Sequence, residues 1–537
     1  MLHSEYHKHL STCFLSFYER DDFWKLLVSY AKEFTIIANL NLDPVIVLLN
    51  SLYSPVHRAT PRDPISMLRS LLLMTATKEA SITKWVKNTR ALSLYAIMAG
   101  FHPDDTPGIG TYYDFMKRLI DGPYQKPCEH TVKKRSEFVC GLHRRNFQSE
   151  KDAKKDEFDP NCSQSERLVE KLLAEANEPR PNGLEKILED LLVGVGILPS
   201  IQEGALSGLD NLMLSGDGSI LRTAASSRGK PTCSCRSQGI YRCGHDRDYT
   251  SPTAKWCYDA YRDCYLFGDR YYHLVVHQNG HDLPLLTVMP GGNESDYTLS
   301  LKAFDRFLKA ANENGLDMRI SIFCGDGHHD SCAHYHYFQE KEVSPVIPLS
   351  EKSKNVYPHL LEERGIRLDT DGVPLCPEGV RMRHHQYNAK KRVHVYTCPV
   401  KRNTHRNGLS IYVTHCEECP RGKDCAPESS LAPLVYIKSE TDPRLYPPIP
   451  RDSERFKELY KERTATERGN SLIDTYHLDR SSRNADYGLI RLTLVNIVEH
   501  ALIRYRDALK SSSPDKLLAR TLERIPVVYR EEYLDTG

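Results

Sequence analysis

This sequence has no long apolar run, no pattern of a signal peptide and almost no net charge. No apolar run reaches the ~18 residues that a membrane-spanning helix needs. The first residues, MLHSEYHKHLSTCF, lack the basic and then apolar layout of a signal peptide, so we expect a cytoplasmic protein with no membrane partner. The formal net charge is +1, which neither indicates nor excludes a nucleic-acid partner, because local cationic patches decide that affinity.

Charged and apolar residues are present in the proportions of a folded protein. Apolar residues make up 40% and charged residues 27% of the chain, as in globular rather than disordered proteins. The 537 residues are too many for one core and predict three or four domains. Sixteen cysteines in a long cytoplasmic chain indicate reduced thiols, some of which can hold a metal. We find no internal repeat.

The N-terminal part of the chain is predicted to be helical. Within residues 1–125, FWKLLVSYAKEF and ISMLRSLLLMTA carry apolar residues at helical spacing, which predicts an all-α domain. Residues 126–207 are rich in charge and predict a connector with helices rather than core. The connector contains a second, weaker cationic patch, which comprises Lys133, Lys134, Arg135, Arg144 and Arg145.

The pattern changes to strands alternating with helices after residue 207. Short apolar runs such as LMLSGDGSIL, YYHLVVHQ and RISIFCGDG end at Gly, Pro or Asp, as strands do. Residues 208–350 and 453–537 therefore predict two parts of one α/β core with a mixed sheet. Residues 351–452, rich in Cys, His, Arg and Pro, predict a subdomain inserted between those parts.

Two aspartates follow apolar runs in this core. Asp217 lies between Gly216 and Gly218, and Asp326 lies between two further glycines. Flanking glycines allow a tight turn that leaves the carboxylate uncrowded. An ordinary turn explains either aspartate alone equally well, but two such turns in one α/β region favour a shared site.

The third candidate carboxylate lies on a predicted long helix, residues 453–477. At 100° per residue, Tyr460, Arg463, Glu467 and Asp474 fall on one face of that helix. A solvated helix face also carries mixed charges, and that interpretation is the better one when the helix is taken alone. Three acids from two strand ends and one helix could nevertheless hold two Mg²⁺ or Mn²⁺ ions roughly 4 Å apart, and an arginine one turn earlier could contact a phosphate.

These segments resemble the DDE transposases of bacterial insertion sequences. LSGDGSILRTAASSRGKP is similar to their first-Asp strand, and CGDGHHDSCAHYHYFQEKEVSPVIPLS is similar to their second-Asp segment. YKERTATERGNSLIDTYHL meets their pattern of Tyr, Arg and Glu with Tyr460, Arg463 and Glu467. The pattern continues with a lysine seven residues after the glutamate, where this chain has Asp474.

The resemblance implies a ribonuclease-H-like core, interrupted before the Glu helix by an inserted subdomain. It implies metal-dependent cleavage at transposon ends, followed by strand transfer, with Asp217, Asp326 and Glu467 as catalytic metal ligands and Tyr460 and Arg463 on the DNA end. The partners would be double-stranded DNA, contacted also by the N-terminal domain, and a second copy in a homodimeric synaptic complex, in a nucleoid-associated location. Asp330 competes with Asp326, but we expect it to cap the next helix.

Two cysteine clusters are candidate structural zinc sites, because four protein ligands leave no open position on the metal. The second cluster has the more regular CEEC spacing, with Cys376, His394 and His415 as spare ligands, and reduced thiols are the alternative for both clusters. The first cluster comprises Cys233, Cys235, Cys243 and His245, and the second comprises Cys398, Cys416, Cys419 and Cys425.

A basic stretch runs through the predicted insertion. RMRHHQYNAKKRVHVYTCPVKRNTHRNG contains no acid and predicts strands that carry a phosphate-binding face, although a solvated loop is the alternative. Its candidate DNA contacts are Arg381, Arg383, Lys390, Lys391, Arg392, Lys401 and Arg402. Two other functions stay open: a nuclease of the same fold without strand transfer, and a zinc-dependent DNA-binding regulator without catalysis.

Overall fold

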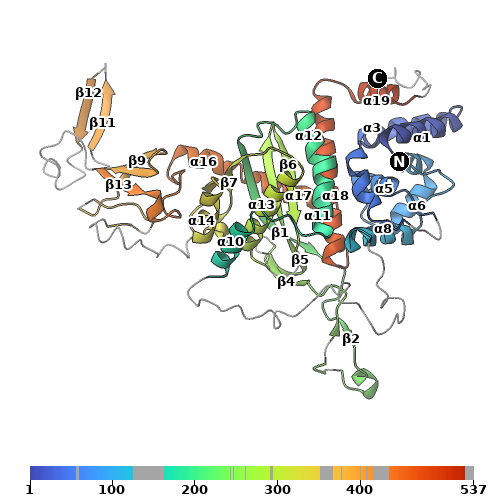
Figure 1. Cartoon of the computed structure of the whole chain (residues 1–537), viewed down its shortest axis with the longest axis horizontal. Coiled ribbons are helices and arrows are strands. Elements are labelled where there is room, and N and C mark those ends of the chain that lie inside the picture. The colour runs from blue at the N-terminus through green and yellow to red at the C-terminus, as the bar shows by residue number, and fades with distance from the viewer. Residues whose placement is uncertain are drawn as a thin grey trace.

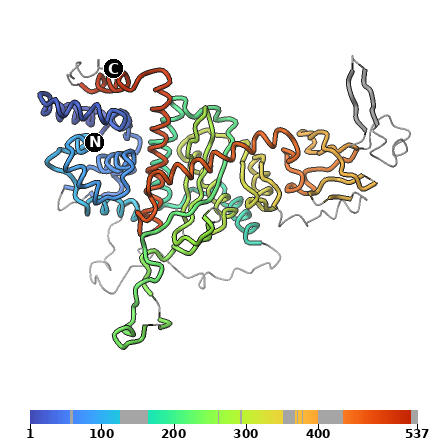
Figure 2. The backbone as a smooth tube through the Cα atoms, turned by 180° about the vertical axis from the view of Figure 1, so that it is seen from behind, coloured from blue at the N-terminus to red at the C-terminus, as the bar shows by residue number. Residues whose placement is uncertain are grey.

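The computed structural model describes residues 1–526, with gaps at 56–59, 125–162, 242, 246, 260–261, 291–293, 351–366, 370, 377, 399–400, 407–408 and 415–433, and without the side chains of residues 401–414. A six-stranded sheet lies in the middle of the molecule (Figures 1 and 2). Its strands are β1 (Leu212–Arg222), β4 (Lys255–Asp259), β5 (Cys264–Gln278), β6 (His281–Val288), β7 (Ile320–Cys324) and β8 (Ser344–Val346).

The sheet is mixed, as the alternation of apolar runs predicted. The strand order is β4-β5-β1-β7-β8, and β6 also pairs with β5. β5 runs antiparallel to β1, β4 and β6, whereas β1, β7 and β8 are parallel neighbours. The predicted α/β class with a mixed sheet is therefore confirmed.

Helices cover both faces of this sheet. α13 (Asp296–Glu313) packs on β1, β5 and β6, and α14 (Cys332–Glu340) connects β7 to β8. α16 (Glu454–Lys461) contacts β8, α17 (Thr464–Asp474) crosses β1, β5 and β6, and α18 (Ala485–Leu509) packs along β6. α19 (Pro514–Glu523) packs on the N-terminal helices.

The described residues before position 125 form helices and no strand. α5 is buried along nearly its whole length, and it packs against α18, so that N-terminal helices, sheet and α18 share one hydrophobic core. The helices are α1 (His3–Ser16), α2 (Asp21–Ser29), α3 (Ala31–Asn39), α4 (Ile46–Asn50), α5 (Pro64–Ala76), α6 (Ile82–Ala91), α7 (Ser93–Ala99) and α8 (Ile109–Asp121), with the 3-10 turn η1 (Asp43–Val45).

Residues 163–202 differ from the predicted connector because they pack into the core. α10 (Gln164–Ala174) lies on α13 and α14 with Val169 buried, and α11 (Leu184–Leu192) packs on α18. The π-helix η2 (Val193–Ile197) and α12 (Leu198–Gln202) continue α11. The apolar stripes of these helices outweigh the charge of the segment as a whole.

Two parts of the chain extend from the central sheet. A narrow arm between β1 and β4 carries β2 (Lys230–Pro231), β3 (Arg247–Asp248) and the turn η3 (Cys235–Gln238) (Figure 1). In the predicted insertion, β9 (Arg383–Asn388), β10 (Val393–Thr397) and β13 (Leu434–Lys438) form a sheet with its own small core, and β11 (Lys401–Arg406) pairs with β12 (Leu409–Thr414). The turns η4 (Gly327–His329) and η7 (Ser439–Thr441) complete the described elements.

No single helix in the described residues is long and apolar enough to cross a membrane. One pair, Ala31–Asn39 with Asp43–Ser51, meets the criteria of length and composition only when its two parts, bent by 53°, are taken together.

The glycines around Asp217 have a different role from the predicted turn. β1 continues through them to Arg222, and Asp217 pairs with His273 in the middle of the strand. A methyl group on Gly216 would lie 2.2 Å from the Tyr272 hydroxyl, and one on Gly218 would lie 2.0 Å from an Asp296 oxygen. Glycine is therefore needed for close approach and not for a bend.

We expect Gly216→Ala to destabilise the protein by about 1–3 kcal/mol, because the added methyl group forces Tyr272 or β1 to move. Urea unfolding followed by tryptophan fluorescence measures this change. Gly110→Ala is the matched control: Gly110 lies in α8 with open space around it, so its substitution should be neutral or stabilising. Equal stabilities of the two variants would contradict this account of Gly216.

His500 makes the folded state sensitive to acid. It is fully buried between the Ser200 hydroxyl and the carbonyl of Pro284, and burial lowers its pKa to about 4. Below about pH 6.5 the unfolded chain binds a proton at His500, whereas the folded chain does so only near pH 4. The contribution of His500 to the free energy of unfolding is therefore present in full above pH 6.5 and is lost as the pH falls toward 4.

We expect the loss of unfolding free energy between pH 7 and pH 4.5 to be smaller in His500→Gln than in the wild type, by up to about 2–3 kcal/mol. Urea titrations at several pH values measure it. The exposed His102→Gln serves as control and should follow the wild type. Parallel pH profiles for wild type and His500→Gln would show that His500 is not responsible.

Candidate functional site

The two candidate aspartates lie at neighbouring strands. β7 pairs with β1 only as far as Ser215, so Asp217 on β1 and Asp326, two residues after β7, both lie beyond the paired segment. Successive residues of a strand face opposite sides of the sheet. Asp217 shares its face of the sheet with His273. A methyl group added at Gly469 of α17 would lie 3.3 Å from the His273 ring, so α17 packs on this face. Asp217 therefore faces the helix of Glu467.

The carboxylate of Asp326 is held in its ionised form. His329 Nδ1 lies 2.7 Å and His328 Nδ1 lies 2.8 Å from its two oxygens, and the backbone N–H of His328 donates a further bond at 2.9 Å. Burial opposes ionisation, but the hydrogen bonds and charges of both histidines outweigh burial and hold the pKa of Asp326 well below its usual range.

The carboxylate of Asp217 is in the opposite state. Burial, joined by repulsion from Asp296 and Asp326, raises the pKa of Asp217 to about 6. The positive charges of His329 and Arg463 offset part of this rise. Asp217 is thus a carboxylate that lacks enough positive charge around it.

The predicted long helix from 453 to 477 is divided into α16 and α17. Glu462 and Arg463 form a turn between them with helical backbone angles. Phe456 of α16 packs with Cys324 and Val346, at the ends of β7 and β8, and this packing sets the position of the turn. The turn brings Arg463 close enough to Asp217 for their charges to interact.

Glu467 lies on the expected face, but its partner is an arginine. Arg463 forms an ion pair with Glu467, and the Arg463 guanidinium lies 5.6 Å from the centre of the Tyr460 ring. Burial raises the pKa of Tyr460, Arg463 lowers it, and the charges of Asp326 and Glu467 raise it further, so Tyr460 is within electrostatic reach of both acids. Among the described residues, however, the oxygens of Asp217, Asp326 and Glu467 are not gathered within 4.8 Å of one another.

Sequence reasoning missed three groups that surround the aspartates. Asp296 begins α13, forms an ion pair with Arg270 at 3.3 Å and acts on Asp217 through space. The Tyr272 hydroxyl hydrogen-bonds to Nε2 of the fully buried His329 at 2.8 Å, which extends the contacts of Asp326 into the core. The one sequence signal of these neighbours is the pair of glycines in β1, Gly216 and Gly218, which leave space for Tyr272 and Asp296.

Asp330 has a structural role that differs from the predicted helix cap. Ser331 caps α14, and Asp330 accepts two bonds from Arg444, with Nε at 2.9 Å and Nη2 at 2.6 Å, in a pair that is almost fully buried. This ion pair joins the loop after β7 to the inserted subdomain. Asp474 lies at the other end of α17, where it is exposed and 3.5 Å from Arg262.

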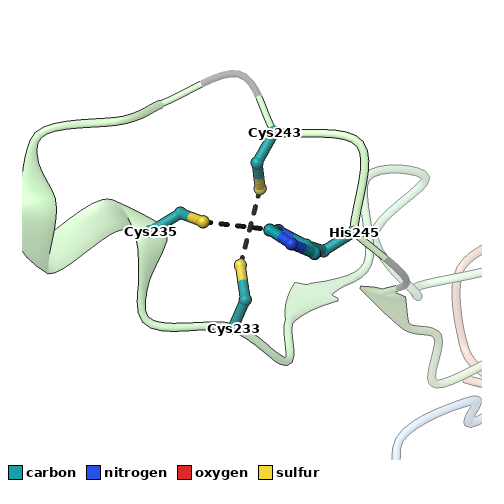
Figure 3. A group of neighbouring side chains, drawn as sticks. All are labelled: Cys233, Cys235, Cys243 and His245. Atoms are coloured by element: carbon teal, nitrogen blue, oxygen red, sulfur yellow. Dashed lines mark hydrogen bonds between the residues drawn. The ribbon is translucent and has the colours of Figure 1, made fainter.

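The first cysteine cluster forms a site that can hold a metal ion such as Zn²⁺. Its four ligand atoms, from Cys233, Cys235, Cys243 and His245, lie within 4.8 Å of one another at the tip of the arm (Figure 3). The sulfurs of Cys233 and Cys243 are 3.5 Å apart, and the sulfur of Cys235 is 3.3 Å from His245 Nδ1. A hydrogen bond from the Cys235 backbone, followed by one from Cys243, lowers the pKa of Cys233 to about 7, whereas the hydrogen bond with Cys233 raises the pKa of Cys235 to about 11. The pair therefore favours a thiolate at Cys233.

Three of the four cysteines of the second cluster, Cys416, Cys419 and Cys425, lie outside the described residues, and so does the spare ligand His415. Cys398 and the spare ligands Cys376 and His394 do not form a metal site with other described residues. Cys398 is buried, Cys376 lies in the small core of the insertion, and His394 is buried with hydrogen bonds to His384 and to the Tyr446 carbonyl.

The basic stretch is divided between two hairpins. Arg383, Lys390, Lys391 and Arg392 are exposed on β9 and the turn to β10, which leaves them accessible to an anionic partner. Arg381 is already paired with Asp369 and Asp371 at 3.2 and 3.1 Å. Lys401 and Arg402 lie in β11, where side chains are outside the described structure, and the weaker patch at Lys133, Lys134, Arg135, Arg144 and Arg145 is outside it altogether.

Comparison with known proteins finds no protein family and no curated protein that matches this chain.

We expect the purified protein to contain zinc, and Cys243→Ser to lose one equivalent of it per chain, because three ligands hold the ion less well than four. Elemental analysis after dialysis measures the metal content. Cys257→Ser, a buried cysteine of β4 outside the cluster, should retain the wild-type content. Identical zinc contents in wild type and Cys243→Ser would rule out this site.

Proposed function

We propose that this chain is a DDE transposase, which cleaves DNA at transposon ends and joins the freed ends to target DNA. The observation that carries the proposal is that two groups from distant parts of the sequence, Asp326 after the neighbouring strand β7 and Arg463, which pairs with Glu467, lie within electrostatic reach of Asp217 on β1.

The arrangement of strands supports a ribonuclease-H-like core. Three antiparallel strands, β1, β5 and β6, are followed by β7 and β8 parallel to β1, with a helix before each parallel strand. The sequence resemblance implies this fold, with Asp217 on the first-Asp strand, Asp326 in a segment of strand, helix and strand, and Glu467 on a helix. The insertion with its own core, between β8 and α16, occupies the position that the resemblance implies.

The donor set suits a divalent cation. The candidate ligands are carboxylate oxygens, which Mg²⁺ and Mn²⁺ prefer. Burial, followed by repulsion from Asp296 and Asp326, raises the pKa of Asp217, as expected of an acid whose ionised form a cation would stabilise. Two such ions, held by Asp217, Asp326 and Glu467, would supply activation of the attacking oxygen and stabilisation of the leaving oxygen.

The other residues position these acids and the DNA. His328 and His329 keep Asp326 ionised and fix its orientation. Arg463 holds Glu467 away from the two aspartates, and a DNA phosphate that accepts bonds from Arg463 would release Glu467 toward them. In this scheme DNA binding itself completes the set of three acids.

We expect Asp217→Asn, Asp326→Asn and Glu467→Gln each to lower metal-dependent cleavage by about a hundredfold or more, since each removes a charge worth several kcal/mol in the transition state. Binding of the same DNA should persist. A cleavage and joining assay on DNA that carries the sequences flanking the gene, with Mg²⁺ or Mn²⁺, measures the effect.

Glu458→Gln, an exposed acid of α16, is the matched control and should keep activity. Full activity of an Asp217, Asp326 or Glu467 variant would remove that residue from the mechanism. Cleavage without joining would instead identify a nuclease, and zinc-dependent DNA binding without any cleavage would identify a regulator.

A further inference from the structure

A polar cavity of about 410 Å³ lies between the end of β1 and the beginning of the arm. Neither the proposed chemistry nor the metal cluster uses it. Two kinds of side chain dominate its walls, arginines and aromatic rings: Arg222, Arg228, Arg480, Trp256, Tyr265 and Phe267.

The aromatic rings of this cavity are unusually exposed. Trp256 is 57% and Tyr265 is 66% exposed, whereas the other two tryptophans of the chain, Trp24 and Trp85, are 3% and 0% exposed. Trp256 pairs with Phe267 across β4 and β5, with ring centres 5.4 Å apart, and Tyr265 occupies the next pair on the same face. Large rings left in contact with water at neighbouring positions indicate a surface that another molecule covers.

The arginines of the cavity offer free positive charge. Arg228 and Arg480 are exposed and have no acidic partner among the described residues, while Arg222 is 3.6 Å from Asp479. The sequence of the arm beyond Arg228, residues 229–248, adds to the charge, with four Lys or Arg against two Asp. Arg247 of the arm donates a hydrogen bond of 2.7 Å to the carbonyl of Arg228, which ties the arm to the cavity.

We propose that this cavity binds an unpaired stretch of a DNA strand, with bases stacked on Trp256 and Tyr265 and phosphates on Arg228 and Arg480. Exposed flat rings beside guanidinium groups are what single-stranded nucleic acid requires, since every base has a face to stack and every linkage has a charge. An acidic peptide would satisfy the arginines but would leave the rings without flat partners. Bases inside a duplex do not offer these faces.

The proposal rests on the proposed function, because it assigns a second contact to the same DNA. Arg222 follows Asp217 by five residues of β1, a distance of roughly 17 Å along the strand. That distance corresponds to about five nucleotides of B-form spacing. A strand cut beside Asp217 could therefore reach the cavity once its end is released from the duplex.

Binding of fluorescein-labelled (dT)12 and of a 12-base-pair duplex to the full chain, without divalent metal so that no cleavage occurs, tests the proposal. We expect Trp256→Ala to weaken (dT)12 binding about 5- to 150-fold, with duplex binding changed less than twofold. The double variant Arg228→Gln/Arg480→Gln should lower the slope of log K against log salt by about 1.4. Because Trp256 is the exposed tryptophan, (dT)12 should quench wild-type fluorescence but not that of Trp256→Ala.

The control is Arg319→Gln, an exposed arginine outside both the cavity and the N-terminal helices, and it should bind as the wild type does. Unchanged (dT)12 binding in both cavity variants would overturn the proposal, and so would free dTMP that binds as tightly as (dT)12. The cleavage assay is independent: Trp256-dependent binding without cleavage retains the cavity and rejects the transposase, and cleavage with unchanged (dT)12 binding does the reverse.

Discussion

The carboxylate of Asp217 is buried within electrostatic reach of Asp296 and Asp326, and the positions of these three acids constrain the residues around them in the central sheet. Neighbouring residues supply opposite charge to each acid in a different way. Two histidines hold Asp326, and Arg270 pairs with Asp296. Burial and the nearby acids raise the pKa of Asp217, and the positive charges of His329 and Arg463 offset only part of this rise.

The same crowding dictates the composition of β1. Gly216 and Gly218 leave room for the Tyr272 hydroxyl and for Asp296, so the acids and the buried Tyr272–His329 contact can meet without a bulge. On the opposite face, Phe456 docks α16 at the ends of β7 and β8 and thereby directs Arg463 toward Asp217. Sheet and helix thus position the acids from two sides.

The parts that extend from the sheet lie outside the main core, and the insertion is attached by a buried ion pair and by the apolar contact of Ile449 with Cys324 and Val346. The buried ion pair of Asp330 and Arg444 connects the loop after β7 to the insertion. Asp330, the alternative to Asp326 in the sequence analysis, therefore has a structural role. The arm has two very short strands and little buried surface, so a metal ion held by Cys233, Cys235, Cys243 and His245 would stabilise it. Both parts carry exposed cations.

Periodicity in the sequence by itself determined the class of the fold, the strand that carries Asp217 and the strand that precedes Asp326, because apolar runs and their breaks are local signals. Local patterns also identified the four candidate metal ligands of the arm, since close spacing in the chain keeps them near one another. The tertiary structure alone decided what depends on packing between distant segments. It bound Glu467 to Arg463, paired Asp330 with Arg444, buried the helices of the predicted connector and placed Asp296 within electrostatic reach of Asp217. These contacts are made by residues far apart in the sequence, and no local pattern of residues records which distant side chains will pack together.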